Sequence, residues 1–259
     1  KNNLPYDVVV ERLHIEEPEP PAPVTEPEKT FEEVLDEHPV SIQVNGQWQT
    51  FPNAKAAEEA SYEEYKANLR RNAKNFRITD EHLGEGGPKA KFQANVNAIR
   101  LLKELEAAGQ QASPEQQEIL SQYVGWGGLS DAFDPEKPAW ALEYAQLKEL
   151  LTPEEYAAGR SSTLNAHYTS PTVIKAIYDA VDRMGFETGN ILEPSMGVGN
   201  FFGMLPEEMR NSRLYGVELD PVSGRIAKQL YPKADITVGG FETTDRRDFF
   251  DLAIGNVPF

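Results

Sequence analysis

The stretch "ILEPSMGVGNFFG", residues 191–203, decides the fold of this chain. An apolar start, a glycine-containing turn and a second apolar run predict a buried strand, a tight turn and a helix in immediate succession. Gly197 and Gly199 allow the backbone to pass close to a ligand, and the N-terminus of the following helix directs free N–H groups towards it. We therefore expect a nucleotide-like cofactor to bind where this strand ends.

An acidic residue at the end of the next expected strand supports this interpretation. Glu218 closes the segment "LYGVELD", 21 residues after Gly197. A carboxylate in this position accepts hydrogen bonds from both hydroxyls of a ribose. A glycine turn alone is equally typical of a purely structural loop, but the turn together with the acid favours an adenosine-containing cofactor.

Sites for dinucleotides and for S-adenosylmethionine both use a glycine turn and an acidic residue. Two features of the sequence distinguish the two kinds of site. The dinucleotide fingerprint has a third glycine three residues after the second, where this chain has Phe202. Glu193 and Pro194 precede the turn, and a carboxylate there suits the ammonium group of a methionine moiety better than a pyrophosphate. The sequence favours S-adenosylmethionine, with a nicotinamide enzyme as the weaker alternative.

In the C-terminal part of the chain, strand-like and helix-like segments alternate, as in an α/β fold. Short apolar runs at 191–192, 214–217, 234–238 and 249–255 are separated by helical stretches, which predicts a parallel sheet with right-handed crossovers. A helix is expected over 171–184. Its predicted apolar stripe consists of Val173, Ile174, Ile177, Val181 and Met184.

The middle of the chain is predicted to be helical. In the segment 91–109, apolar positions recur at three- and four-residue spacing (Phe92, Val96, Ile99, Leu102 and Leu105). Ser113 with Gln116, and Thr152 with Glu155, form capping-box patterns that mark two further helix starts.

Two glycine-containing loops lie between these helices, at 83–89 and 123–134. The first interpretation is a pair of turns, with Trp126 filling the core. The alternative is a phosphate contact through exposed backbone N–H groups and Lys89 or Lys91.

The N-terminal part is expected to be extended, apart from one hairpin. Prolines and carboxylates dominate 16–29, which predicts a mobile linker. Asn45 and Gly46 lie between two β-prone runs, as a tight turn requires, so a hairpin is expected at 41–51. The expected domains are a linker (1–40), a hairpin with a helical module (41–160) and an α/β domain (161–259).

Charge and composition narrow the classes of function. The net charge of −17 argues against a general nucleic-acid coat, but residues 61–103 carry 9 basic and 5 acidic side chains, so a local phosphate contact remains open beside an ordinary solvated helix face. The chain has no cysteine and its four histidines lie far apart, which argues against a metal site. It has neither a membrane-spanning apolar stretch nor an export leader, so we expect a soluble cytoplasmic protein.

The segment "AIGNVPF", residues 253–259, places Asn256 at the C-terminal end of the fourth expected strand, on the edge where open α/β sheets bind ligands. It resembles the Asn-Pro-Pro-aromatic motif of adenine-specific DNA amino-methyltransferases. "EPSMGVGNFFG" resembles their cofactor loop, "GVELD" their ribose-binding segment, and "HYTSP" at 167–171 the segment ahead of the first helix.

The resemblance implies a partial Rossmann-like methyltransferase sheet that binds S-adenosylmethionine, with DNA as partner. The implied cofactor-binding residues are Tyr168, Thr169, Glu193, Pro194, Gly197, Gly199, Asn200, Glu218 and Phe241. The Asn256 side-chain oxygen and the Val257 carbonyl accept the two hydrogens of an adenine amino group, which pulls electron density onto its nitrogen. Pro258 keeps Val257 extended, and Phe259 stacks on a base rotated out of the duplex.

A wider resemblance covers about residues 40–259. The segments "FRITDEHLGEGGPKAKFQANVNAIRLLKEL" and "YVGWGGLSDAFD" are similar to the region ahead of the methylase core in large helicase-methylase proteins of phages and conjugative elements. The resemblance implies that the chain is an N-terminal fragment of such a protein, inactive on its own, with a helicase region as a partner in the same longer chain.

Two departures from the family pattern leave an alternative open. Val257 stands where the family usually has proline, and Gly240 stands where an aspartate often holds the cofactor adenine, leaving Phe241 to stack and Glu242 as a substitute. The alternative is a non-catalytic DNA-handling or antirestriction module built on a degenerate methylase fold.

Overall fold

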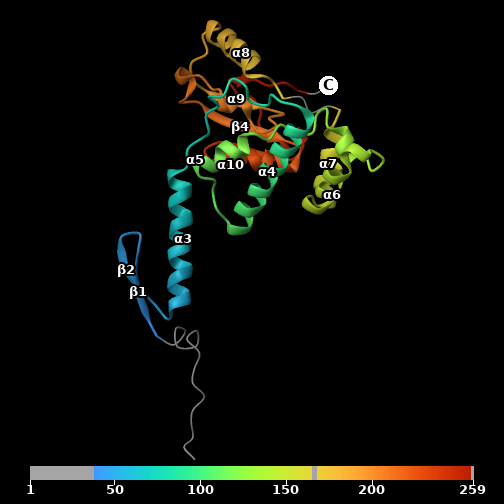
Figure 1. Ribbon diagram of the computed structural model, residues 1–259. Coiled ribbons are helices and arrows are strands. Elements are labelled where there is room, and N and C mark those ends of the chain that lie inside the picture. Colours follow the sequence, from blue (N-terminus) through green and yellow to red (C-terminus); the bar gives the residue numbers. More distant parts are fainter. Residues whose placement is uncertain (1–37, 165–167, 258–259) are drawn as a thin grey trace, which may run out of the picture. The chain divides into compact units, whose positions relative to one another are not determined.

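The computed structural model describes residues 38–164 and 168–257 (Figure 1). It divides the chain into two compact units, with the division between Glu64 and Tyr65, inside helix α3 (Ala54–Asn72). The expected linker at 16–29 lies outside the described residues. The domain boundaries expected at residues 40 and 160 stay a prediction.

The described part of the first unit contains the expected hairpin. Strands β1 (Val40–Val44) and β2 (Gln47–Phe51) pair antiparallel, with Val44 opposite Gln47. Asn45 and Gly46 have φ values of 52° and 74°, as a two-residue hairpin turn requires, so this prediction is confirmed. The Asn45 N–H donates a hydrogen bond of 2.5 Å to Glu64.

Helices form the first part of the second unit. They are α4 (Pro88–Ala108), α5 (Pro114–Ser121), η1 (Ser130–Phe133), η2 (Pro138–Trp140), α6 (Ala141–Leu150) and α7 (Pro153–Ser162). The apolar stripe predicted on α4 is buried along its whole length. Both predicted capping boxes are present, at Ser113 for α5 and at Thr152 for α7.

The second part is α/β, as expected. Its elements are α8 (Pro171–Arg183), β3 (Asn190–Glu193), α9 (Asn200–Gly203), η3 (Glu207–Met209), β4 (Arg213–Glu218), α10 (Pro221–Leu230), β5 (Asp235–Val238), η4 (Phe241–Thr243) and β6 (Leu252–Ala253). The four strands form one sheet in the order β5-β4-β3-β6, and every neighbouring pair is parallel. The predicted parallel sheet is therefore confirmed.

The strand order creates a switch point between β3 and β6. From β3 the chain proceeds outwards through β4 to β5, and then returns to pair β6 on the other side of β3. In open parallel sheets, the loops after the two strands at such a point leave on opposite sides and open a crevice. Glu193 ends β3, and Asn256 follows β6, so both lie at this place.

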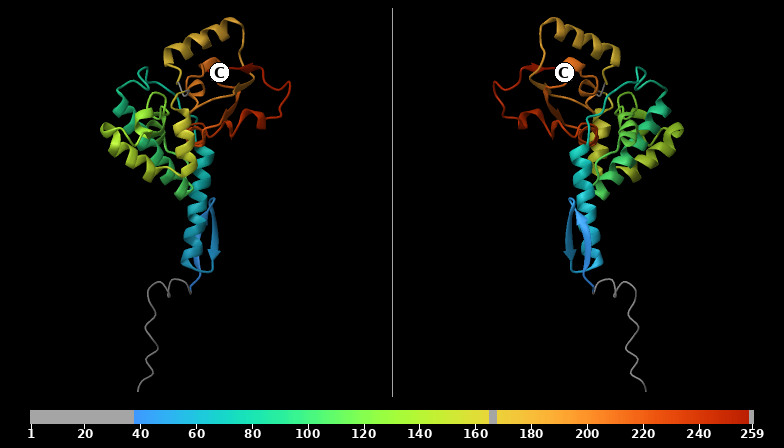
Figure 2. Two further views of the ribbon diagram at one scale, coloured as in Figure 1. Left: turned by 90° about the vertical axis from the view of Figure 1, so that its right-hand side faces the viewer. Right: turned by 90° about the vertical axis from the view of Figure 1, so that its left-hand side faces the viewer.

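One hydrophobic core joins the two parts of the second unit. It runs from Phe92 and Trp126 in the helical part to Ile191 and Ile226 in the α/β part. In both views of Figure 2 the green helices lie on one side of the orange and red segments that contain the sheet. Trp126 is 1% exposed, which confirms the interpretation that it fills the core.

The stripe predicted on α8 needs a correction. Ile174, Tyr178 and Val181 are the buried residues of this helix, whereas Val173 is 48% and Met184 75% exposed. The buried face follows the spacing i, i+4, i+7, and the Tyr178 hydroxyl reaches the Phe201 carbonyl at 2.8 Å. Ile177 is partly buried against the core, whereas Val173 lies beside Ile174 off the buried face and Met184 follows the last residue of the helix.

Two absences concern the described part of the chain. None of its helices combines the length and the apolar composition that crossing a bilayer demands. Within the same residues, no group of three or more histidine, aspartate or glutamate side chains lies close enough to hold a metal ion.

Candidate functional site

The turn after β3 depends on its glycines. Gly197 and Gly199 have φ values of 57° and 86°, in the left-handed region that favours glycine. A Cβ atom on Gly199 would lie 2.6 Å from the ring of Tyr231, so a side chain has no room there. The helix expected after the turn is α9, which has only four residues. The expected helix is therefore only a single turn of helix, and the N–H groups of Met196, Gly197 and Gly199 are bonded within the protein.

Glu218 ties the end of β4 to the glycine turn. One carboxylate oxygen accepts the Gly197 N–H at 2.6 Å, and the other accepts the Asp220 N–H at 2.7 Å. The side chain is 8% exposed. Burial raises the pKa of Glu218, and the two backbone donors oppose this shift. Because each carboxylate oxygen has two lone pairs, both can still accept a further hydrogen bond.

Glu193 is buried without a full set of partners. It is 2% exposed, and its Oε2 atom has no hydrogen-bond partner. Burial raises the pKa of Glu193 well above its usual value, and the charge of Glu218 adds to this shift. The structure thus keeps a carboxyl group in an environment that disfavours its charge unless a cation arrives.

A cavity of about 500 Å³ opens at the switch point. We call it the switch-point cavity. Six of the predicted site residues line it: Thr169, Glu193, Gly197, Asn200, Glu218 and Asn256. The glycine turn, the acid that ends β4 and the asparagine after β6 therefore share one cleft, although 59 positions separate Gly197 from Asn256 in the sequence.

Tyr168, a seventh predicted residue, also lines this cavity and packs between the loop after α5 and the glycine turn after β3. A Cβ atom on Gly125 would lie 2.7 Å from the Tyr168 ring, and one on Gly197 would lie 3.3 Å from it. Its hydroxyl is 3.4 Å from that of Ser223. The ring therefore fits closely against two backbones that carry no side chain.

The other predicted residues lie outside this cleft. Gly199 is buried behind the turn, and Pro194 is half-buried beside it. Phe241 is 52% and Val257 51% exposed, and neither lines the cavity. Pro258 and Phe259 lie outside the described residues. Their roles stay predictions.

The helical part of the unit forms one wall of the switch-point cavity, which the sequence did not predict. Tyr123 and Gly125 come from the loop after α5, and Ala158, Ser161 and Ser162 come from α7. The sequence held one signal for this wall. The small residues of α7 recur at the spacing i, i+3, i+4, which places all three on one face of the helix.

Asn95 fixes the loop that carries Tyr123 and Gly125. This side chain is fully buried on α4. Its amide donates to the Gly125 carbonyl at 2.5 Å, and its oxygen accepts the Val124 N–H at 2.8 Å. The loop is thus held in a single position at the edge of the cavity.

The alternative interpretation of the glycine-containing loops was a phosphate contact through Lys89 or Lys91. The two lysines have different surroundings in the structure. Lys89 donates to the Ala139 carbonyl at 2.6 Å, pairs with Glu143, and lies 3.9 Å from the centre of the Trp140 ring. Lys91 lines a second cavity of about 320 Å³, beside Glu85. Lys89 is engaged within the protein, which leaves Lys91 as the lysine that faces a cavity.

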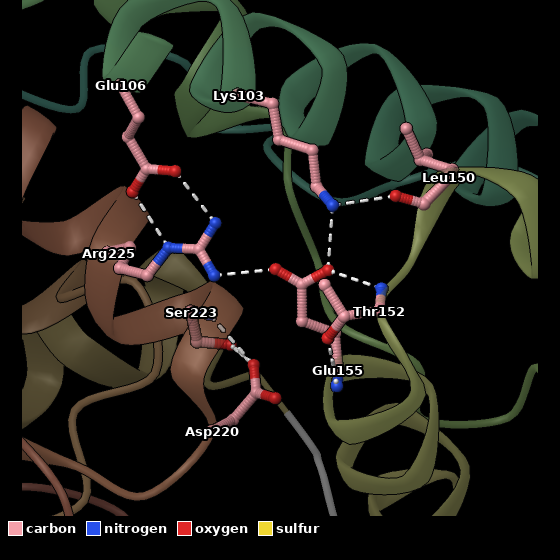
Figure 3. Close-up of polar contacts among 8 residues, drawn as sticks. All are labelled: Lys103, Glu106, Leu150, Thr152, Glu155, Asp220, Ser223 and Arg225. Carbon is pink, nitrogen blue, oxygen red and sulfur yellow. Dashed lines mark hydrogen bonds and ion pairs between the residues drawn. The ribbon is translucent and has the colours of Figure 1, made fainter. Parts of the chain in front are cut away.

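A cluster of charged side chains joins the helical wall to the sheet side of the cavity (Figure 3). Arg225 of α10 makes two hydrogen bonds of 2.8 Å to Glu106 of α4, and one of 2.6 Å to Glu155 of α7. Glu155 also accepts from Lys103 at 2.8 Å and from the Thr152 N–H at 2.9 Å. We call this set of residues the Arg225 clamp.

Glu155 is the buried centre of the clamp, with 5% of its side chain exposed. Burial alone would raise the pKa of Glu155, but the hydrogen bonds from Lys103 and Arg225 outweigh burial and lower it. The same helix α10 begins at Asp220, whose carboxylate accepts the Ser223 N–H at 2.8 Å. The clamp therefore fixes α7 relative to the residues that line the opposite wall.

Removing the clamp should destabilise the second unit. The Arg225→Ala variant leaves Glu155 with Lys103 as its one charged partner, and we expect a loss of about 1–3 kcal/mol in the free energy of unfolding. Urea-induced unfolding measures this loss.

The matched control is Arg210→Ala, because Arg210 pairs with the exposed Glu207 within one helical turn. This pair should contribute less than about 0.5 kcal/mol. Equal unfolding midpoints for the two variants would contradict the assigned role of the clamp.

Comparison with known proteins relates the chain to methylases. It is similar to Defense against restriction protein B of Escherichia phage P1, with 27% identity over 179 residues, which is 68% of this chain and 6% of that protein. It is also similar to Type II methyltransferase M.CvrRI of Paramecium bursaria Chlorella virus XZ-6E, with 45% identity over 74 residues, 29% of this chain and 19% of that protein. The matched regions thus span less than a fifth of either relative. No protein-family profile and no solved structure matches.

Proposed function

We propose that this chain binds the cofactor of an S-adenosylmethionine-dependent methyltransferase that acts on adenine amino groups in DNA, through a Rossmann-like sheet. The observation that carries the proposal concerns unpaired polar atoms. Three buried side-chain atoms among the described residues have no hydrogen-bond partner, namely Tyr123 Oη, Glu193 Oε2 and Asp220 Oδ1. All three residues line the switch-point cavity.

Such atoms point to a polar ligand. A buried polar group without a partner costs about 1–3 kcal/mol, so native proteins rarely leave several of them around one cavity unless something else satisfies them. The cavity volume of about 500 Å³ lies within the range of small-molecule sites. A ligand with several donors and acceptors would therefore recover the cost.

The residues present fit S-adenosylmethionine. The Glu193 carboxyl would accept hydrogen bonds from the ammonium of the methionine part, and the free lone pairs of Glu218 would accept the two ribose hydroxyls. Gly197 lines the same cavity, with the Tyr168 ring packed against its backbone. Phe202, which replaces the third glycine of a dinucleotide site, is 3% exposed and packs against Tyr231. These features support a sulfonium nucleoside over a dinucleotide.

The chemistry required of the protein is to activate a weak nucleophile. The lone pair of an adenine amino group is delocalised into the ring, so its nitrogen attacks poorly. Asn256 and the Val257 carbonyl would accept the two amino hydrogens and return electron density to the nitrogen. S-adenosylmethionine supplies a methyl group on a positively charged sulfur. With S-adenosylmethionine bound there, the nitrogen would form its bond to this methyl carbon as the carbon–sulfur bond breaks, the electron pair would stay on sulfur, and an amino proton would leave to solvent.

Calorimetric titration tests the proposal. Added to the folded chain, S-adenosylhomocysteine should bind to one site, and NADH under the same conditions should give no comparable heat. Absence of heat at millimolar S-adenosylhomocysteine, from a chain shown to be folded by circular dichroism, would refute the proposed cofactor.

Cofactor binding should tighten as the pH rises from about 5 towards neutrality. The raised pKa keeps Glu193 protonated in the free protein beyond the usual range of a glutamate, and an ammonium ligand requires its charged form. Binding therefore releases a proton over the window from the pKa of Glu193 in the complex up to its raised pKa in the free protein, and the affinity gains at most about tenfold per pH unit. Above the raised pKa the dependence disappears. Calorimetry across this pH range gives the slope.

Two controls isolate the contribution of Glu193. 5′-Methylthioadenosine has no amino-acid portion, so its binding should not vary with pH through this carboxyl. The Glu193→Gln variant should remove the part of the pH dependence that S-adenosylhomocysteine shows beyond 5′-methylthioadenosine; the part common to both ligands, to which Glu218 contributes through its own raised pKa, should stay. A difference in slope between the two ligands that survives in the variant would assign the proton to another group.

DNA is the proposed partner, in agreement with the methyltransferase similarity. A helicase region in the same longer chain stays an expectation from the resemblance. The basic segment 61–103 is one place where a phosphate backbone would find positive charge.

The second candidate function is a non-catalytic antirestriction module. The similarity to Defense against restriction protein B covers the larger part of this chain, and Val257 and Gly240 depart from the methylase pattern. If the module is non-catalytic, the Asn256→Ala variant of the full natural protein keeps any protection of DNA against restriction. Protection that disappears together with methylation favours the enzyme.

A further inference from the structure

Two of the unpaired buried atoms form a complementary pair of hydrogen-bonding groups. The Asp220 side chain offers an acceptor at Oδ1, and Tyr123 Oη has a proton to donate. They come from different parts of the second unit, the start of α10 and the loop after α5, and both residues line the switch-point cavity.

The position of Asp220 is fixed by its other contacts. Its Oδ2 atom accepts the N–H of Ser223 at 2.8 Å and the hydroxyl of Ser223 at 2.5 Å, which caps α10. Its own N–H donates to Glu218 at 2.7 Å. The carboxylate therefore has one oxygen committed to the helix and one oxygen without a partner.

Tyr123 is equally constrained. It is 1% exposed, its ring lies edge-on to Trp126 at 6.2 Å, and Asn95 holds the backbone of the next two residues. Burial and then the charge of Asp220 raise the pKa of Tyr123, so its hydroxyl keeps its proton. The hydroxyl of Ser223 donates to Asp220 at 2.5 Å, and its oxygen can still accept, so without a ligand it is the neighbouring acceptor for the Tyr123 proton.

The location of the pair relative to Glu218 suggests what it contacts. Asp220 follows Glu218 by two residues and is hydrogen-bonded to it, so both lie at the same end of the cavity. If Glu218 binds the ribose, the base attached to that ribose lies at this end as well. One edge of adenine offers an amino group that donates and a neighbouring ring nitrogen that accepts, which complements an acceptor beside a donor.

We propose that Asp220 and Tyr123 read the base of the cofactor, with Asp220 Oδ1 accepting from the adenine amino group and the Tyr123 hydroxyl donating to the adjacent ring nitrogen. The inference rests on the proposed function and makes the helical part of the unit a determinant of base specificity. It also accounts for the adenine contact that Gly240 cannot make. The Glu242 carboxylate lies against Gly240, and neither residue lines the cavity.

The Asp220→Asn variant tests the inference through ligand preference. An asparagine can keep its carbonyl oxygen towards Ser223, which preserves the helix cap, and it then presents an NH₂ donor in place of Oδ1. S-inosylhomocysteine, in which a carbonyl replaces the amino group and the ring nitrogen carries a proton, is the matched ligand. We expect the natural protein to prefer S-adenosylhomocysteine by about tenfold or more, and the variant to prefer S-inosylhomocysteine.

Tyr123→Phe provides a second readout that does not involve the helix cap. This variant should bind S-adenosylhomocysteine about tenfold more weakly than the natural protein does. Its affinity for S-inosylhomocysteine should change by less than about threefold. Ser195→Ala is the control, because Ser195 lines the same cavity on the β3 side and should leave the ratio of the two affinities unchanged.

The outcomes separate the two proposals. Equal affinity of the natural protein for both ligands, or an unchanged ratio in Asp220→Asn, overturns the base-reading role while the cofactor site stands. If Asp220→Asn fails to fold, an equal loss for both ligands in Tyr123→Phe overturns it. Binding of neither ligand by the folded natural protein overturns the proposed function and this inference together.

Discussion

Replacing Asn256 by alanine in the full natural protein that carries this sequence should reduce methyl transfer to DNA by about a thousandfold, while S-adenosylhomocysteine still binds within about threefold. The physical reason is that an alanine cannot accept a hydrogen from the adenine amino group, so the nitrogen lone pair stays delocalised. Transfer of tritium from labelled S-adenosylmethionine to DNA measures the rate, and calorimetry measures cofactor binding.

The experiment distinguishes a role of Asn256 in methyl transfer from a role in cofactor binding, because the two are measured separately. Asn256 lines the switch-point cavity together with Glu193 and Glu218 but is itself exposed, so its removal should not disturb the fold. Asn211→Ala is the matched control, because Asn211 is an exposed asparagine that does not line this cavity. Methylation that continues at the natural rate in Asn256→Ala would remove this residue from the chemistry and favour a non-catalytic role.

Replacing Glu218 by alanine should weaken S-adenosylhomocysteine binding by about a hundredfold or more. The variant lacks the carboxylate that would accept hydrogen bonds from the ribose hydroxyls. Each hydrogen bond to a charged group contributes about 1.5–3 kcal/mol. The N–H groups of Gly197 and Asp220 would also lose their acceptor, so the glycine turn would lose its attachment to β4. Calorimetric titration of the folded variant measures the loss.

A conservative variant distinguishes binding from folding. Glu218→Gln keeps the shape of the side chain and one acceptor oxygen, so it should bind more weakly than the natural protein and more tightly than Glu218→Ala. Glu242→Ala is the control at an exposed acid outside the cavity. If Glu218→Ala binds as tightly as Glu242→Ala does, the ribose contact is wrong.

Features set by short stretches of sequence were predicted well. The Asn45–Gly46 turn needs two residues that tolerate positive φ, and the capping boxes at Ser113 and Thr152 need partners three residues away. Each of these is decided within a few positions of the chain. The glycine turn at Gly197 belongs to the same class, because its backbone conformation excludes most other residues.

The convergence of Gly197, Glu218 and Asn256 was predictable for a different reason. Parallel strands place their C-terminal ends on one edge, so three segments that each follow a strand must meet there. The prediction needed only the strand assignments and not the details of packing.

The helical wall of the cavity could not be predicted in this way. Tyr123 and Ala158 meet the residues after β4 across 60 to 100 positions of sequence, and no local pattern specifies such a contact. It depends on the Arg225 clamp and on Asn95, whose partners become visible only when the helices are packed. The exposure of Val173 and Met184 was missed because the apolar stripe was drawn one position too far at each end, whereas the buried face is Ile174, Tyr178 and Val181 and the helix ends at Arg183.

A crystal structure of the chain with S-adenosylhomocysteine tests the central claim most directly. We predict the ligand in the switch-point cavity, with its amino group at Glu193, its ribose hydroxyls at Glu218 and its sulfur facing Asn256. A ligand bound elsewhere on the chain, or in this cavity without contacts to Glu193 and Glu218, would contradict the account.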